Sequence, residues 1–135
     1  MNRLKTAAAI VICAGLAACA PVEEPAADGY DTALANLDTT RACFFTREIN
    51  GYSDAPSSSA RNDRLYISTG VNERWLLETY GSCPDLDFAN AVGLDVRGSV
   101  SVCTGQRETL LVPSTIPGEV DRCPVRVLGR VIEDD

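Results

Sequence analysis

Four cysteines, Cys43, Cys83, Cys103 and Cys123, constrain what the greater part of this chain can fold into. They lie far apart and include no Cys-x-x-Cys pair, which is unlike the ligand spacing of a zinc ribbon. A domain of this length has a small core, and small exported domains commonly carry disulfides for that reason. If the chain is exported, its cysteines therefore predict two structural disulfide bonds.

The first residues carry the export signal on which that prediction depends. Arg3 and Lys5 precede an apolar run at residues 7–17, which would extend over about 16 Å as a helix, against a hydrocarbon core of about 30 Å. We therefore expect residues 1–18 to be a signal peptide and not a membrane span. The run ends in Leu-Ala-Ala-Cys, which resembles the lipobox of bacterial lipoproteins. Cys19 is the expected lipidation site, through which acyl chains hold the protein to a membrane; the alternative is an ordinary secretory signal.

Residues 19–40 are expected to form a flexible tether that carries the lipid. The stretch is rich in alanine, proline and acid and has little that would form a core. Ala20 follows Cys19, and the absence of Asp at this place implies, by the resemblance to Gram-negative lipoproteins, an outer-membrane protein that faces the periplasm. The folded domain is then expected to cover residues 41–135.

Period-two alternation predicts that this domain is all-β. Leu65 and Ile67 share one face of such a run, and several short runs of this kind are separated by Gly, Pro, Ser, Asn and Asp. The pattern indicates a small antiparallel barrel or sandwich. Residues 72–81 fit either a capped helix or a strand, and the aromatic content favours the strand. Residues 50–63 are expected to be the longest loop, and residues 84–91 a short helical turn.

The same alternation suggests how the cysteines pair, although the spacing allows three pairings. In residues 43–49 it places Cys43, Phe45 and Ile49 on one face, and near the end of the chain it places Cys123 inward. Each cysteine would then be the first residue of a strand and would point inward. The predicted disulfides are therefore Cys43–Cys123 and Cys83–Cys103.

Composition excludes several classes of function. The chain has no histidine, which excludes a Ser-His-Asp triad, a Cys-His dyad and every zinc or copper site that contains histidine. Arg3 and Lys5 are lost with the signal peptide, which leaves 10 bases against 19 acids. This negative charge argues against nucleic acid as a partner and against adsorption to anionic lipid. No cofactor and no metal are expected.

Few residues suggest a site. Asp85 and Asp87 are the only carboxylate pair that suggests general acid–base catalysis or calcium binding, although two acids on a turn are usually solvated. Tyr66, Arg74 and Trp75 form a candidate contact surface, since aromatic residues and arginine are enriched at interfaces. The alternative for Trp75 is a place in the core. No residue is predicted to be catalytic.

A set of motifs in the folded part is shared with a known family. The set comprises Cys43-Phe44, Cys83-Pro84-Asp85-Leu86, Val102-Cys103-Thr104-Gly105 and Arg122-Cys123-Pro124-Val125. In these motifs the chain resembles a family of small cysteine-containing bacterial envelope lipoproteins, known only as a domain of unknown function. The resemblance implies export and supports the limits of the domain, and it implies no activity.

These features together predict a lipid-anchored envelope protein whose β domain binds a partner protein or another envelope component without catalysis. One alternative is a periplasmic inhibitor of a hydrolase such as a lysozyme, with residues 50–63 or 113–122 as the inhibitory loop. A less favoured alternative is an enzyme that uses only carboxylates, for which Asp85 and Asp87 are the candidates.

Overall fold

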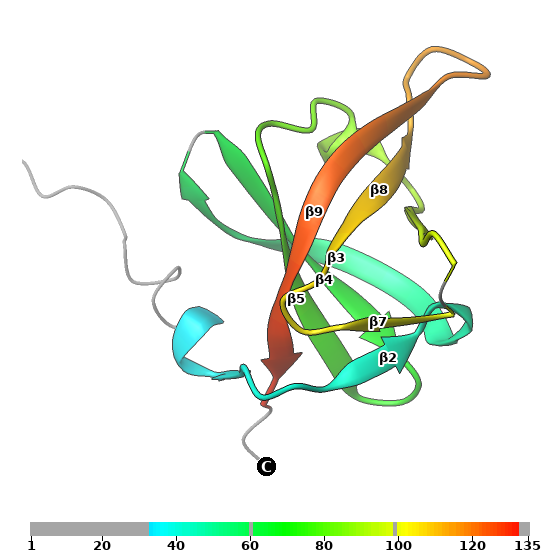
Figure 1. Cartoon of the computed structure of the whole chain (residues 1–135). Coiled ribbons are helices and arrows are strands. Elements are labelled where there is room, and N and C mark those ends of the chain that lie inside the picture. Colours follow the sequence, from blue (N-terminus) through cyan, green and yellow to red (C-terminus); the bar gives the residue numbers. More distant parts are fainter. Residues whose placement is uncertain (1–32, 60, 99, 133–135) are drawn as a thin grey trace, which may run out of the picture.

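The computed structural model describes residues 33–59, 61–98 and 100–132, which form a mostly β fold (Figure 1). The predicted signal peptide (residues 1–18), the predicted lipidation site Cys19 and most of the predicted tether lie outside the described residues. Within the described part, no helix has the length and apolar character needed to cross a membrane.

Seven strands form one antiparallel sheet, which curves into a half-barrel (Figure 1). Six of them follow the order β3-β4-β5-β9-β8-β6, and β1 pairs with one end of β9. The predicted antiparallel all-β class is confirmed, and the sheet is left open between β3 and β6. The strands are β1 (Leu37–Asp38), β3 (Ile49–Ser59), β4 (Asn62–Thr69), β5 (Glu73–Thr79), β6 (Gly93–Asp95), β8 (Arg107–Pro113) and β9 (Val120–Val131).

A second, two-stranded sheet pairs β2 (Cys43–Phe45) with β7 (Ser101–Cys103). Phe44 and Val102 lie opposite each other and are both buried, while Cys43 and Phe45 are exposed. The ring of Phe44 lies 4.9 Å from that of Trp75, centroid to centroid, so the small sheet packs on the core of the half-barrel. The prediction that Cys43 and Phe45 point inward is wrong, because Phe44 takes the inward position.

Two short 3-10 helices connect strands: η1 (Thr46–Glu48) follows β2, and η2 (Leu86–Phe88) follows β5. The second confirms the helical turn predicted within residues 84–91, and its Leu86 is buried in the core. The choice of a strand for residues 72–81 is also confirmed, by β5.

Residues 50–63 are not a loop, contrary to the prediction. Most of them belong to β3 and to the first residues of β4, and these two strands pair as a long hairpin. Their Gly, Ser, Asp and Pro content is tolerated because β3 is an edge strand, with one edge and much of one face in contact with solvent. Sequence composition therefore indicated a loop where backbone pairing to β4 is sufficient for a strand.

The predicted disulfide pairing is wrong. The structure joins Cys43 to Cys103 and Cys83 to Cys123. Cys43 lies directly opposite Cys103 in the β2–β7 pair, on the outward side from Phe44. The chain leaving β5 stays beside β9, where the Tyr80 backbone N–H donates to the carbonyl of Pro124, and this brings Cys83 next to Cys123.

The folded unit also begins earlier than residue 41. In β1, Leu37 pairs with Val131 and Asp38 with Arg130, and a carboxylate oxygen of Asp38 lies 3.1 Å from the guanidinium of Arg130. Gly129 permits this contact, because a Cβ at that position would lie 2.6 Å from the carbonyl oxygen of Asp38. Part of the predicted tether is therefore a strand of the sheet.

Candidate functional site

The half-barrel has a cleft on its open side, between β3 and the segment that leads into β6. One part of it, of about 340 Å³, lies between residues 49–52 and residues 90–92. A second part, of about 370 Å³, continues along β3 to Ser53 and Asp54 and is lined on the other side by Asp87, Ala89 and Asn90. The two parts share Tyr52 and Asn90, so we treat them as one groove and call it the seam cleft.

A β-bulge determines which side chains of β3 reach the floor of the seam cleft. Ile49 pairs with Thr69 but Gly51 already pairs with Ser68, so Asn50 is the extra residue in β3. The bulge changes the phase of the alternation, and both Ile49 and Tyr52 pack against the core although they are three residues apart. Asn50 is exposed, and its side-chain amide donates to the carbonyl of Gly70.

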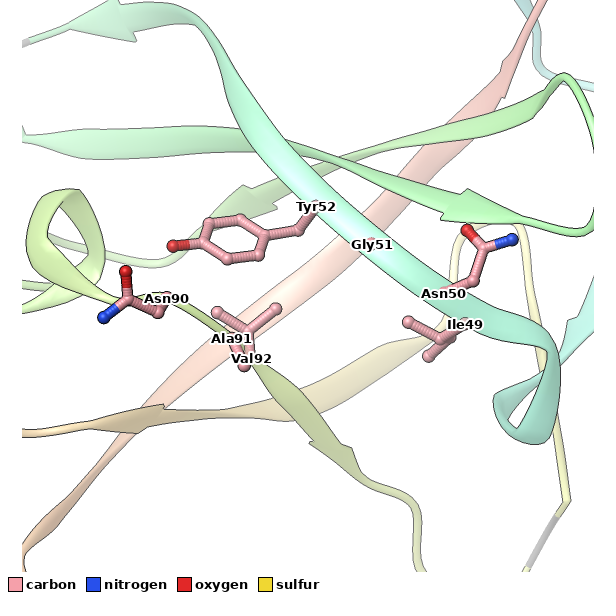
Figure 2. A pocket seen from close by; sticks show the side chains of 7 residues that line it. All are labelled: Ile49, Asn50, Gly51, Tyr52, Asn90, Ala91 and Val92. Atoms are coloured by element: carbon pink, nitrogen blue, oxygen red, sulfur yellow. The ribbon is translucent and has the colours of Figure 1, made fainter.

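The opposite wall of the cleft is held to the core by η2 and the residues that follow it. Leu86 is buried, and Ala89 and Val92 pack against the core cluster. The Tyr52 hydroxyl crosses the opening and donates a hydrogen bond to the carbonyl of Ala89. Figure 2 shows the ring of Tyr52 projecting from β3 toward the segment that carries Asn90. The two walls are thus joined at one point, with open space on either side of it.

The electrostatics of the seam cleft are acidic. Burial raises the pKa of the Tyr52 phenol above its usual value of 10.0, and the carboxylates of Asp54 and Asp87 raise it further. The lining residues include no histidine, lysine, arginine or cysteine. Elsewhere too, the described ranges contain no group of three His, Cys, Asp or Glu residues that could hold a metal ion. The cleft thus offers an apolar floor, amides, one phenol and two carboxylates.

The structure separates the carboxylate pair that the sequence suggested. Asp85 lies against the loop between β8 and β9, where it accepts hydrogen bonds from the backbone N–H of Thr115 (3.3 Å) and from its hydroxyl (3.4 Å). A hydrogen bond from the Ser114 hydroxyl is the main reason that the pKa of Asp85 lies below 3.8. Asp87 lines the seam cleft instead. The two acids therefore serve different parts of the fold.

The candidate contact surface of Tyr66, Arg74 and Trp75 has to be corrected. Trp75 is fully buried, its ring lies against Phe44, and its indole N–H donates to the hydroxyl of Thr69 at 3.1 Å. Only Tyr66 and Arg74 remain near the surface, with the guanidinium carbon 5.2 Å from the centroid of the tyrosine ring. The alternative, in which Trp75 belongs to the core, is the correct one.

Sequence reasoning did not identify the seam cleft. Tyr52 lies in a stretch whose composition indicated a loop, and Asn90 follows a turn without any motif. One signal was available: Tyr52 is the only large side chain in the polar run between Ile49 and Arg61. An isolated aromatic residue of this kind indicates a packing or binding role.

Comparison with known protein families gives a match over most of the chain. Residues 2–131 match the model of a family that is described as a family of unknown function (DUF6491). No curated protein and no solved structure matches the chain significantly.

Proposed function

We propose that this protein, which belongs to the DUF6491 family of unknown function, is a non-catalytic binding protein held in the bacterial envelope by lipid. The anchor is argued from the sequence, where a short apolar run ends in the Leu-Ala-Ala-Cys motif at Cys19. The same signal, with Ala20 after the cysteine, fits the outer membrane and a domain that faces the periplasm. The partner is an envelope protein or another envelope component.

The seam cleft is the proposed binding site. It is concave, its floor is formed by Ile49, Tyr52 and Val92 of the core, and its rim bears amides and carboxylates. A largely apolar floor with a few polar groups is the usual make-up of a ligand site. Catalysis by a nucleophile activated by histidine or lysine has no candidate among the residues that line it.

Site-specific photo-crosslinking in living cells tests this proposal. A photoreactive phenylalanine analogue replaces Asn90 in the seam cleft and, in two matched variants, Ile116 at the β8–β9 loop and Pro124 on the outer side of β9. All three positions are exposed, so each variant is expected to fold. A Cys19→Ala form provides the control for the anchor, together with incorporation of labelled palmitate.

We expect palmitate on the native protein and not on the Cys19→Ala form. Crosslinks are expected from position 90, and few from position 124. If position 90 captures nothing above the level of position 124, the seam cleft is not the binding site and the proposal fails. If the native protein carries no labelled palmitate, the lipid anchor is wrong and that part of the proposal fails.

The β8–β9 loop favours a second candidate function, inhibition of a hydrolase. Within residues 114–119 the Ser114 N–H donates to the carbonyl of Glu119, and the Glu119 N–H donates to that of Ile116. Asp85 fixes the loop from outside, and the side chain of Ile116 is 56% exposed. A rigid loop that presents an aliphatic side chain suits insertion into the active site of another protein. Inhibition of a lysozyme-type muramidase by the purified domain, lost on Ile116→Ala, would support this candidate.

A further inference from the structure

The seam cleft lies between two strand edges. β3 and β6 stand at the ends of the strand order, so each has one edge that pairs with no strand in the described part of the chain. Such an edge presents backbone N–H and C=O groups that can pair with another chain. Addition of a strand to a free edge is an established mode of peptide recognition. The cleft therefore offers backbone groups as well as a space of suitable shape.

The usable part of the β3 edge is short and ends at a proline. From Gly51 to Ala55 every residue has a regular partner in β4, which holds this stretch extended. Pro56 has no N–H to donate, and the register to β4 becomes irregular between Ala55 and Ser59. The proline protects the far part of β3 from added strands, while the part that borders the seam cleft has no such protection.

The side chains along the cleft differ from one end to the other. At one end Ile49 and Val92 offer apolar contact, and Tyr52 lies between the ends. At the other end Asp54 and Asp87 line the cleft from opposite walls. Tyr52 lines the same part of the cleft as both carboxylates, and their charges help to raise the pKa of its phenol. A ligand that fills the whole cleft thus meets an apolar end and an anionic end.

We infer that the seam cleft binds an extended segment of another polypeptide, which adds as a strand along the edge of β3 and places a lysine or arginine between Asp54 and Asp87. This inference rests on the proposed binding function and specifies its ligand. Backbone pairing to residues 51–55 provides the register, and an apolar side chain of the segment contacts Ile49 and Val92. The basic side chain provides the specificity, because opposite charges fix the orientation of a bound partner.

Charge also decides between a foreign segment and this chain's own segments. Residues 19–32, which precede the described part, carry Glu23, Glu24, Asp28 and Asp31 and no base, so they are repelled by the anionic end of the cleft. A second copy paired edge to edge would bring Asp54 of each copy toward the same seam, and the chain as a whole has a net charge of −7. Like charges across a strand pair are unfavourable. A basic segment of a different protein fits both observations.

Selection from a random nine-residue peptide library on the purified domain (residues 20–135) tests the inference, since nine extended residues span about 30 Å, enough for the cleft. Enriched peptides are expected to carry one lysine or arginine at a fixed position among alternating β-branched or aromatic residues. Each is then resynthesised with N-methyl groups on one alternate set of backbone nitrogens or on the other. A paired strand should lose affinity at least tenfold with one set and little with the other, because only alternate N–H groups face β3.

The charge part of the inference is tested with Asp54→Asn and Asp87→Asn. Both side chains are at the surface, so the substitutions are not expected to unfold the domain. Each should weaken a selected peptide about fivefold, the effect of one exposed ion pair. Glu119→Gln removes the same charge from the remote β8–β9 loop and should change nothing. Ala91→Trp, which fills the cleft from an exposed position, should abolish binding while the circular dichroism spectrum is kept.

Three results would overturn the inference. They are the absence of any enriched peptide, equal tolerance of both N-methyl sets, and peptides that bind the Ala91→Trp variant as well as the native domain. If a peptidoglycan glycan fragment binds the native domain and not Ala91→Trp, strand addition fails while the proposed binding function stands. If position 90 also captures nothing in cells, both fail.

Discussion

At the scale of single residues, Tyr52 connects the core of the half-barrel with the seam cleft. Its ring packs on the core, its hydroxyl donates to the carbonyl of Ala89 across the seam cleft, and two carboxylates lie near it. The hydrogen bond joins the wall that carries Ala89 to β3. Tyr52 therefore links the shape of the cleft to the stability of the fold.

The raised pKa of Tyr52 predicts how stability depends on pH. Because the folded state holds the phenolic proton more tightly than the unfolded state, the contribution is fully present below pH 10 and is lost as the pH rises through the higher folded value. Urea unfolding followed by Trp75 fluorescence should give a midpoint that falls above about pH 10. Tyr52→Phe should lower the free energy of unfolding by about 1 kcal/mol at neutral pH and should make the alkaline decline shallower.

A matched variant separates this effect from general alkaline unfolding. Tyr66→Phe removes a phenol of β4 that does not line the seam cleft, and should keep the alkaline decline of the native protein. If Tyr52→Phe and Tyr66→Phe show the same pH dependence, the assignment to Tyr52 is wrong.

At the scale of elements, the two disulfides have different surroundings. Cys43 is exposed and Cys103 is half-buried, whereas Cys83 and Cys123 are only 3% and 7% exposed. The bonds join residues 60 and 40 positions apart, so loss of either should cost about 4 kcal/mol of stability through loop entropy. The two bonds are therefore expected to contribute similarly to the stability of the fold, but Cys43–Cys103 is more accessible to a reductant than Cys83–Cys123.

Limited treatment with a water-soluble phosphine should reduce Cys43–Cys103 before Cys83–Cys123, because the reagent must reach the sulfur atoms. Alkylation of the freed thiols followed by peptide mass spectrometry measures the order. The expected intermediate carries label on Cys43 and Cys103 only, and its half-barrel remains folded. Equal labelling of all four cysteines at partial reduction would show that exposure does not control the reaction, or that the domain unfolds when the first bond breaks.

The elements also show where the sequence was sufficient to predict which residues face the core and where it was not. Period two correctly placed Leu65 and Ile67 on one face of β4 and Cys123 of β9 inward, because both strands have neighbours on each edge and one face on the core. It failed in β2, where alternation alone does not say which of two faces turns inward, and the disulfide pairing failed with it. In β3 the polar composition indicated a loop instead of a strand, and the bulge at Asn50 shifts the phase of the alternation that would place Tyr52 inward.

The candidate site was less predictable than the fold because it depends on contacts between distant segments. Residues 49–54 and 87–92 meet only when the sheet curves, and no local pattern reports that curvature. Asp85 and Asp87 are close in sequence, but a 3-10 turn directs them to different neighbours. Trp75 was assigned to both core and surface for the same reason, since burial depends on the small β2–β7 sheet that covers it.

At the scale of the whole molecule, β1 attaches the N-terminal part of the described chain to the end of β9. Gly129→Ala should displace β1, because the new Cβ would lie 2.6 Å from the carbonyl oxygen of Asp38. We expect a loss of about 1–3 kcal/mol in urea unfolding, and faster hydrogen exchange at Ile132, whose N–H donates to the carbonyl of Asn36. Gly51→Ala is the matched control, since a Cβ there has no atom within 4 Å. Equal stability of the two variants would contradict the role given to Gly129.

β9 determines how far the two ends of the domain lie from each other. Its 12 residues extend over about 40 Å, with β1 at the C-terminal end and the β8–β9 loop at the other (Figure 1). β1, near the start of the described chain, therefore lies at one pole of the domain, and the loop with Ile116 lies at the opposite pole. An anchor on the N-terminal side of β1 would thus hold the loop with Ile116 about one strand length farther from the point of attachment than β1.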